Sequence, residues 1–388
     1  MKIPAGVVSS NQRLCYCNIL TAVVYSCIAL FIGSTFITVD VKEKITTWLP
    51  GDSSQKFLFN FKNSTSSLNS SNSTLCPSQS RPSEIEALPR GIVSQTSDLE
   101  RKTLWGPIDR KGNENSKNLL AISAGIKQKA VVNQMVKKFP FSNFTVILFH
   151  YDGIVDEWND LEWSDKILHI SAIQQTKWWF AKRFLHPDIV TEYKYIFLWD
   201  EDIGVENFDP GRYLEIVERE GLEISQPGLD SKKSNVHYRF TERQLKGDAH
   251  KRIYNLSRGV RCNEKSTGFP CAGFVEMMAP VFSRAAWRCT WHMIQNDLVH
   301  AWGLDMKFGY CALGDPTKKV GVVDKEYIVH KGIPTLGGST TKKGSNVSSS
   351  SNRAAVVRRC YDELAAFNKR WQNATTEDKN WSDPHNQT

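Results

Sequence analysis

Residues 195–205 read Y-I-F-L-W-D-E-D-I-G-V, an unbroken apolar run that leads into three consecutive carboxylates. An apolar run without polar alternation is typical of a strand buried on both faces of a sheet. From residue 117 onward, similar short runs alternate with helical patterns, as in a sheet whose strands are joined by crossover helices. The sequence therefore predicts an α/β fold, with a sheet flanked by helices.

The same patterns place the elements of this fold along the chain. We predict strands at 118–123, 144–150, 166–171, 195–199, 222–226, 272–279 and 320–330. We predict helices at 129–139, 176–184, 212–220 and 283–300. A C-terminal amphipathic helix has one face made of Val357, Cys360, Tyr361, Leu364, Asn368 and Trp371. The polar, basic segment 230–265 is expected to form loops.

The acidic triplet Asp200, Glu201 and Asp202 is expected at the carboxyl end of the buried strand, where ligands bind in open α/β sheets. Like charges about 4 to 7 Å apart repel unless a cation lies between them. Mg²⁺ and Mn²⁺ prefer oxygen ligands and leave positions for phosphate oxygens, so this D-x-D suits a metal–diphosphate clamp. The alternative is a solvated acidic turn.

His330 lies in the late stretch I-V-H-K-G, at the end of another predicted strand. A neutral imidazole is a good Mn²⁺ ligand beside carboxylates, and this position would bring it to the same edge of the sheet. The alternative is a structural histidine with no ligand. Lys331, next in sequence, would hold a phosphate as a point charge, or would simply be solvated.

Asp305 follows Gly-Leu in the stretch H-A-W-G-L-D and is a candidate general base toward an acceptor hydroxyl. Glu276, in G-F-V-E-M-M, is the rival base, and it would need a partner if it were buried. Trp302 and Trp291 offer flat apolar faces to sugar rings, or else pack in the core.

The N-terminal region predicts the topology of the chain. Residues 14–39 carry no charge, which is long for a signal peptide and sufficient for a transmembrane helix, although a cleaved signal remains the alternative. We expect a cytosolic tail at 1–13, this anchor, and a flexible Ser/Asn/Pro-rich stem at 40–115. A catalytic domain at 116–338 would follow, and then a Ser/Asn-rich linker with the C-terminal helix at 339–388.

N-glycosylation sequons all follow the predicted anchor, which favours a single-pass type II protein with a lumenal domain over chance occurrence in a cytosolic chain. They begin at Asn63, Asn69, Asn72, Asn143, Asn255, Asn346, Asn373, Asn380 and Asn386. Six cysteines beyond the anchor would allow three disulfides with 15 connectivities. Cys262 and Cys271, which bracket a short Gly/Pro-containing loop, are our first expected pair.

Composition excludes some classes of protein. The 388 residues are 40% hydrophobic and 11% aromatic, enough for a packed core, so wholesale disorder is excluded. The net charge of +8 is modest and spread along the chain. Because no basic block or RNA-reading motif accompanies it, we expect no nucleic-acid partner.

Six stretches carry a resemblance to a known family: KNLLAISAGIKQK, VILFHYDG, SAIQQTKWWFAKRFLHP, YIFLWDEDIGV, GFVEMMAPVFSR and HAWGLDMKFGYC. Over roughly residues 117–338 the chain resembles an uncharacterised plant family with a domain of unknown function, often labelled lysine-ketoglutarate reductase trans-splicing related. The label implies a reductase, but Ala124-Gly125-Ile126-Lys127 after the first strand contains no G-x-G-x-x-G.

More distantly, the layout is similar to that of GT-A glycosyltransferases of the Golgi lumen. This resemblance implies a Rossmann-type mixed sheet, a nucleoside diphosphate sugar as co-substrate and Mn²⁺ or Mg²⁺ as cofactor. It implies Asp202 and His330 as metal ligands, Asp200 as a metal or nucleotide contact, Asp305 as base or acceptor-binding residue, Asp152 at the nucleoside, and Lys177 and Arg183 near phosphate. Glu201 as the D-x-D spacer and the G-L-D motif depart from the family pattern.

These inferences lead to one main hypothesis and two alternatives. The main hypothesis is metal-dependent transfer of a sugar to a glycan or glycoprotein acceptor by a Golgi membrane protein. The first alternative is a non-catalytic lumenal binding or scaffold protein on a degenerate glycosyltransferase fold. The second is a reductase that binds a nicotinamide cofactor.

Overall fold

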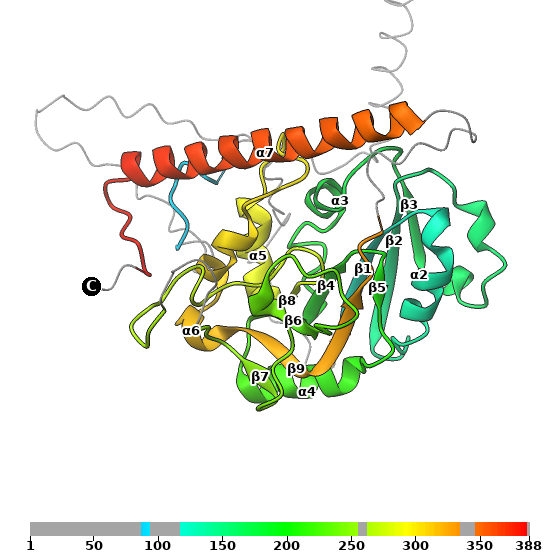
Figure 1. Ribbon diagram of the computed structural model, residues 1–388, viewed down its shortest axis with the longest axis horizontal. Coiled ribbons are helices and arrows are strands. Elements are labelled where there is room, and N and C mark those ends of the chain that lie inside the picture. Colours follow the sequence, from blue (N-terminus) through cyan, green and yellow to red (C-terminus); the bar gives the residue numbers. More distant parts are fainter. Residues whose placement is uncertain (1–86, 94–116, 255–261, 334–345, 386–388) are drawn as a thin grey trace, which may run out of the picture. The chain divides into compact units, whose positions relative to one another are not determined.

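The computed structural model describes residues 87–93, 117–254, 262–333 and 346–385 (Figure 1). The predicted cytosolic tail and anchor, and most of the predicted stem, lie outside these residues. Among the described residues, no helix combines the length and apolar character needed to cross a membrane.

The described residues form one nine-stranded sheet in the order β3-β2-β1-β4-β8-β6-β9-β5, and β7 pairs with β9. The strands are β1 (Asn118–Ala124), β2 (Phe144–His150), β3 (Leu168–Ser171), β4 (Tyr195–Trp199), β5 (Ile203–Gly204), β6 (Ile224–Leu229), β7 (Ala249–His250), β8 (Val281–Ser283) and β9 (Val320–His330). Strands β3, β2, β1 and β4 are parallel, β8 is antiparallel to both β4 and β6, and β9 is parallel to β6. The predicted mixed sheet is therefore confirmed.

Several of the helices begin at side-chain caps that the sequence provides. They are α2 (Lys129–Val136), α3 (Lys177–Phe184), α4 (Pro210–Glu220), α5 (Arg284–Met293), α6 (Pro316–Lys319) and α7 (Asn346–Glu377). Thr176 and Ser283 accept N–H groups from the first turns of α3 and α5. Helix α4 has Asp209 as its N-cap and ends at Gly221, whose φ of 63° is the left-handed conformation that favours glycine.

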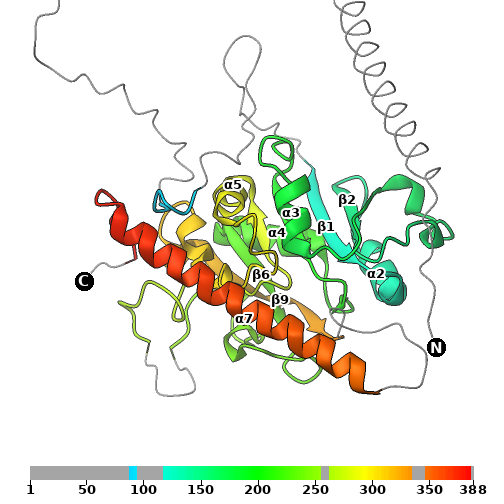
Figure 2. The same ribbon diagram turned by 90° about the horizontal axis from the view of Figure 1, so that it is seen from above.

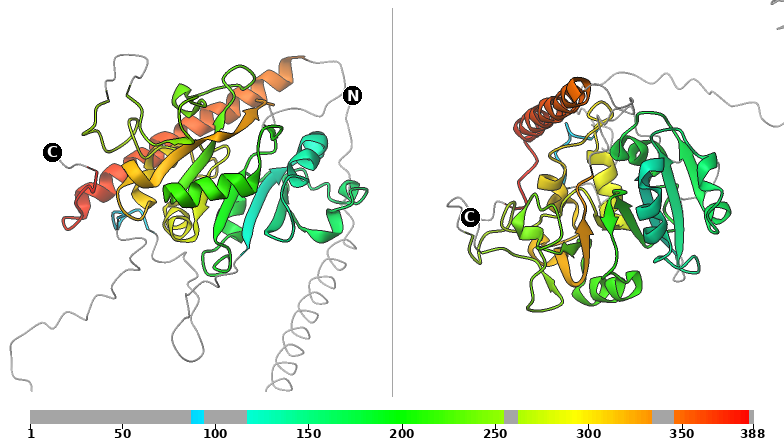
Figure 3. Two further views of the ribbon diagram at one scale, coloured as in Figure 1. Left: turned by 90° about the horizontal axis from the view of Figure 1, so that it is seen from below. Right: turned by 45° about the vertical axis from the view of Figure 1, so that its right-hand side comes forward.

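Helices cover both faces of the sheet, which makes three layers (Figure 1 and Figure 3). Alternate residues of β4 point to opposite sides: Ile196 and Leu198 join the core under α3, α5 and α7, whereas Phe197 and Trp199 join the core under α2 and α4. The apolar run of β4 is thus buried on both faces, as predicted.

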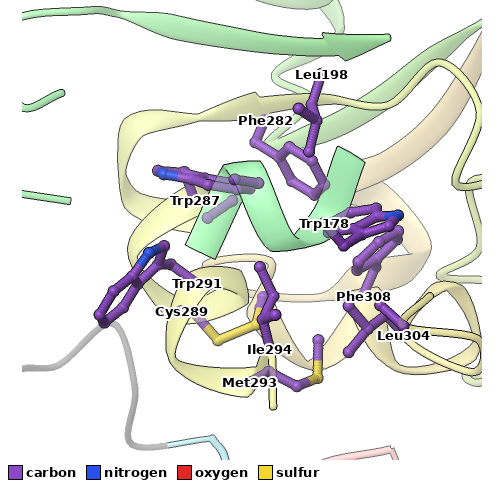
Figure 4. Packing of buried hydrophobic residues seen from close by; sticks show 14 of the residues in the cluster. Trp178, Leu198, Phe282, Trp287, Cys289, Trp291, Met293, Ile294, Leu304 and Phe308 are labelled. Atoms are coloured by element: carbon purple, nitrogen blue, oxygen red, sulfur yellow. A yellow bond between two sulfur atoms is a disulfide. The ribbon is translucent and has the colours of Figure 1, made fainter. Parts of the chain in front are cut away.

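Aromatic rings fill the core beside α5 (Figure 4). Phe282 lies between Trp287 and Phe308, with ring centroids 5.4 and 5.2 Å away, and Phe308 also contacts Trp178. Cys289 of α5 and Cys311 form a disulfide in the same region. The helix and the segment 305–311 are therefore joined covalently as well as by packing.

The predicted disulfide between Cys262 and Cys271 is confirmed, with Cα atoms 5.5 Å apart. Within the described residues Cys360 is a buried free cysteine. Cys76 lies outside them, so the three-disulfide expectation is met for two pairs.

The strand predicted at 272–279 is wrong: this segment is an irregular loop, and the strand β8 begins after it, at Val281. Several of the loop's polar backbone groups are satisfied by side chains: the Lys177 ammonium donates to the carbonyls of Met277 and Met278, and the Gln226 side chain accepts the N–H of Glu276. The helix predicted at 283–300 is also shorter, because α5 ends at Met293.

Part of the predicted stem belongs to the folded domain. Leu88 and Ile92 are buried in the core that includes the C-terminal half of α7, and Arg90 pairs with Asp378 at 2.6 Å.

The buried face of α7 differs from the predicted one: its buried side chains include Cys360, Glu363, Phe367, Trp371 and Ala374. Val357 and Tyr361 are exposed instead.

Candidate active site

The carboxyl ends of β1, β2, β4, β6 and β9 meet at one edge of the sheet, because these strands all run in the same direction. A pocket of about 1010 Å³ lies at this edge. Its lining includes Ser123, Tyr151, Asp200, Glu201, Asp202 and His330, each within or just after one of these strands. The sheet topology thus brings together residues that are more than 200 positions apart in sequence.

Asp202 and His330 form a buried pair in the lining of the pocket. The Nε2 atom of His330 lies 3.5 Å from Oδ2 of Asp202, and its Nδ1–H donates to the carbonyl of Asn235 at 2.7 Å. Burial opposes both charges, but it is outweighed by the interaction between the two groups together with their backbone partners, the N–H of Ile333 at Asp202 and the carbonyl of Asn235 at His330. The pKa of Asp202 is therefore lowered, and the pKa of His330 is raised to about 9.

This pair fits a divalent cation that takes its remaining ligands from a substrate. Within the described ranges, no group of three or more His, Cys, Asp or Glu side chains lies close enough to hold a metal ion. Mg²⁺ is, however, commonly held by one or two protein ligands plus phosphate oxygens, and two adjacent ligands of one octahedral ion lie roughly 3 Å apart. The hydrogen bond from Nδ1 to Asn235 also gives His330 the orientation typical of metal-ligating histidines.

Asp200 is paired with Lys177, whose Nζ atom lies 2.6 Å from Oδ1 of the carboxylate. The same ammonium donates to the carbonyls of Met277 and Met278, at 2.6 and 3.2 Å. Three acceptors use the three N–H donors of Lys177, so this residue neutralises Asp200 rather than offering a free charge to phosphate. Burial still raises the pKa of Asp200, and Asp202 adds to that effect.

Glu201 also has a hydrogen-bond partner of its own, the hydroxyl of Tyr151. Its Oε1 accepts the hydroxyl of Tyr151 at 2.8 Å, and its side chain is buried. Burial and the neighbouring Asp200 raise the pKa of Glu201 to about 8. The three consecutive carboxylates thus each have a separate partner, and the protein itself offsets the repulsion that suggested a cation from the sequence.

The two candidate bases lie in the same pocket but have different surroundings. Glu276 accepts hydrogen bonds from His237 Nδ1 at 2.9 Å and from Thr241 Oγ1 at 3.3 Å. Asp305 accepts the N–H of Met306 at 2.9 Å, and burial followed by the charge of Glu276 raises its pKa to about 7. A carboxylate with a pKa near the working pH is the better proton acceptor, so Asp305 is the stronger candidate.

The raised pKa of Asp305 predicts a pH-dependent stability. The folded value of about 7 exceeds the ordinary 3.8, so the folded chain binds more protons than the unfolded chain between these pH values. Stability is therefore lost as the pH rises from about 4 to about 7. Asp305→Asn, which keeps the acceptor for Met306 but cannot ionise, should raise the Tm by several degrees at pH 8 and leave it unchanged at pH 4.

Differential scanning calorimetry across this pH range checks the prediction. Asp362→Asn, a change on the exposed side of α7, is the matched control and should show no pH-dependent difference from the wild type. Equal Tm values for Asp305→Asn and wild type at pH 8 would contradict the raised pKa.

Other residues predicted for the site are not among the residues that line this pocket. Arg183 lines a separate cavity of about 620 Å³ together with Trp179 and Trp291, so the structure does not place it with Asp200. Asp152 accepts the N–H groups of Ile126 and Ile154 at 2.7 and 3.1 Å. Among the described residues that line the pocket, neither Asp152 nor Lys331 is present.

The two tryptophans that could face a sugar ring or pack in the core lie in different surroundings. Trp291 is 3% exposed and packs in the core with Lys182 over its ring, whereas Trp302 lines the pocket. Residues that the sequence did not indicate also line it: Tyr151, His237, Tyr238 and side chains of α7. Tyr151 follows a predicted strand, so the strand-end rule could have found it, but no local signal marks the others.

Fold and site together define an α/β protein with a mixed sheet and an acidic pocket at its carboxyl-terminal edge. The chain belongs to the family described as "Protein of unknown function (DUF707)", whose model matches residues 79–377. The family membership expected from the sequence is thereby confirmed. No curated protein sequence matches the chain significantly.

Several solved structures are similar to this one. S. aureus TarS, residues 1–349, is 9% identical with a TM-score of 0.35, over 55% of this chain and 59% of that chain. The same fragment in complex with UDP is 10% identical with a TM-score of 0.35, over 68% and 72%. The glycosyltransferase GlyE of Streptococcus pneumoniae TIGR4 is 11% identical with a TM-score of 0.31, over 68% and 66%.

Proposed function

We propose that this chain is a metal-dependent glycosyltransferase that moves a sugar from a nucleoside diphosphate sugar to a glycan or glycoprotein acceptor in the Golgi lumen. The observation that carries the proposal is the pocket at the carboxyl ends of β4 and β9, where Asp200, Asp202 and His330 lie together. Carboxylate and imidazole donors at a strand edge suit a divalent cation and the diphosphate that it binds.

The part of the pocket that would bind the donor nucleotide consists of side chains held in place by ion pairs and hydrogen bonds. Asp202 and His330, once the imidazole has given up its proton, would hold Mg²⁺ or Mn²⁺, and Asp200, fixed by Lys177, would contact the ion or the nucleotide. The ion, when bound, supplies a Lewis acid that offsets charge on the diphosphate leaving group. The hydrogen bond to Asn235 keeps the His330 ring in its orientation while the site is being filled.

The part of the pocket that would bind the acceptor sugar contains Asp305, the proposed proton acceptor. In the transfer, the acceptor oxygen forms a bond to the anomeric carbon, and the bond from that carbon to the β-phosphate oxygen breaks. The nucleoside diphosphate leaves with the bonding electron pair. The hydroxyl proton passes to the carboxylate of Asp305 and from there to solvent.

The proposed location follows from the N-terminal sequence and the sequons. We place residues 14–39 across the Golgi membrane as a single type II anchor, with the folded domain in the lumen. The sequon residues Asn143, Asn373 and Asn380 are exposed, so oligosaccharyltransferase products at these positions would be tolerated sterically.

Two observations disfavour the alternatives. A nicotinamide reductase would need room for a pyrophosphate at the turn after β1, but the carboxylate of Asp152 already accepts the N–H of Ile126 there. A scaffold has no use for the buried pairs, because buried ion pairs by themselves add little stability.

Ligand-dependent stabilisation tests the proposal. The purified chain is heated with UDP, GDP or NADPH, each with Mn²⁺ and with EDTA. We expect one nucleoside diphosphate to raise the Tm only when Mn²⁺ is present. Stabilisation by NADPH with EDTA would support the reductase, and no response to any nucleotide would support the scaffold.

A further inference from the structure

The pocket has a second wall that is chemically unlike the acidic edge. Helix α7 contributes Val356, Val357, Tyr361 and Leu364 to its lining, and Trp302 lies beside them. Figure 2 shows α7 as one continuous helix whose course crosses the region of β6 and β9. The ring centroids of Trp302 and Tyr361 are 5.3 Å apart with planes at 77°, and Tyr361 is 60% exposed. An exposed ring facing a pocket offers an apolar surface with a polar hydroxyl at its edge.

This wall is held against the loop that carries Trp302 and Asp305. The backbone N–H and Nδ1 of His300 donate to the buried carboxylate of Glu363 on α7, at 2.7 and 3.1 Å. A Cβ added at Gly303, whose φ is 99°, would lie 2.8 Å from a methyl of Leu364, so the loop touches the helix closely. The aromatic pair and the candidate base are therefore parts of one packed unit.

The aromatic wall and the carboxylates line the same pocket. Trp302 and Tyr361 share its lining with Asp305 and Glu276. Asp305 follows Trp302 by three positions, so one short segment carries both the ring and the candidate base. A ligand that fills the pocket would meet both kinds of side chain.

We infer that the Trp302–Tyr361 pair is the binding subsite for a pyranose ring of the acceptor glycan, with α7 as the wall that selects the acceptor. The inference rests on the proposed function. A pyranose has an apolar face of C–H groups that packs on an aromatic ring, and hydroxyls at its rim that reach polar groups. The two parts of this surface, rings and carboxylates, match that combination.

The pocket is large for a ligand site. Pockets that enclose one drug-sized ligand measure about 300 to 1,000 Å³, and this one has about 1010 Å³. Its lining combines carboxylates at the strand ends, which suit the donor nucleotide, with the Trp302–Tyr361 pair, which suits a sugar ring.

Glycan binding by the full-length chain in detergent tests this inference. The chain, loaded with UDP or GDP and Mn²⁺, is applied to a printed array of N-glycans, O-glycans and polysaccharide fragments, and Kd values are measured for the bound glycans. We expect Trp302→Ala and Tyr361→Ala to weaken glycan binding at least tenfold. Tyr361→Phe, which keeps the ring, should stay within about threefold of the wild type.

Two controls make the outcome decisive. Tyr254→Ala removes a tyrosine that is 51% exposed outside the pocket and should change nothing. Mn²⁺-dependent stabilisation by the nucleotide should persist in Trp302→Ala and Tyr361→Ala, which shows that both variants fold and bind the donor. Its absence in the wild type would refute the proposed function. With that stabilisation intact, the inference is overturned if the wild type binds no glycan, or if glycan binding is unchanged in both alanine variants.

Discussion

Replacing Asp202 by asparagine is expected to lower the metal-dependent release of nucleoside diphosphate from nucleotide sugars by about 10²-fold or more. The amide keeps an acceptor for the N–H of Ile333, which Oδ2 accepts at 2.8 Å, so the local backbone should be retained. What is lost is the negative charge beside His330, and with it one of the two ligands proposed for the ion. The measurement is the initial rate as a function of Mn²⁺ concentration.

The matched control is Asp165→Asn, which removes a carboxylate on the exposed surface outside the pocket. Its rate and Mn²⁺ dependence should equal those of the wild type. An Asp202→Asn variant with unchanged rate and unchanged Mn²⁺ response would show that the pair with His330 does not bind the ion.

Replacing Asp305 by asparagine is expected to lower kcat by about 10²- to 10⁴-fold, the usual contribution of a general base. The wild-type rate should rise with pH through about 7, because the pKa of Asp305 is raised to that value and only the ionised form accepts a proton. The residual rate of Asp305→Asn should lack this rise. The pH–rate profile of each purified protein checks both statements.

Glu276→Gln separates the two candidate bases. Glu276 already accepts hydrogen bonds from His237 and Thr241, so we assign it a positioning role. We expect the pH–rate profile of Glu276→Gln to keep the rise but to move it to lower pH, because the charge of Glu276 helps to raise the pKa of Asp305. If Glu276→Gln abolished that rise while Asp305→Asn kept it, the assignments would be reversed.

The part of the site that lies at the ends of the strands could be predicted from the sequence. The apolar run 195–199 and the stretch Val320–His330 are strands as predicted, and the residues that end them lie in one pocket. Such runs are local signals, since a strand buried on both faces needs apolar side chains at consecutive positions. The strand-end rule then places Asp202 and His330 at the same edge without knowledge of the rest of the fold.

The irregular segments of the chain could not be predicted from such local signals. The apolar residues 272–279 suggested a strand, but their carbonyls bond to the Lys177 ammonium from across the domain. Nothing local distinguishes a buried loop from a buried strand, because both bury apolar side chains. The same limit applies to Arg183, which lies on the same helix as Lys177 but lines a different cavity.

The sequence by itself determined the α/β sheet flanked by helices, the acidic strand end at 200–202, the histidine that meets it and the disulfide between Cys262 and Cys271. Only the tertiary structure decided which partner each carboxylate has, and that α7 forms a wall of the pocket. The physical reason is the range of the interactions. Strand pattern and caps depend on residues a few positions apart, whereas the pairs Lys177–Asp200 and Trp302–Tyr361 exist only after distant elements have packed together.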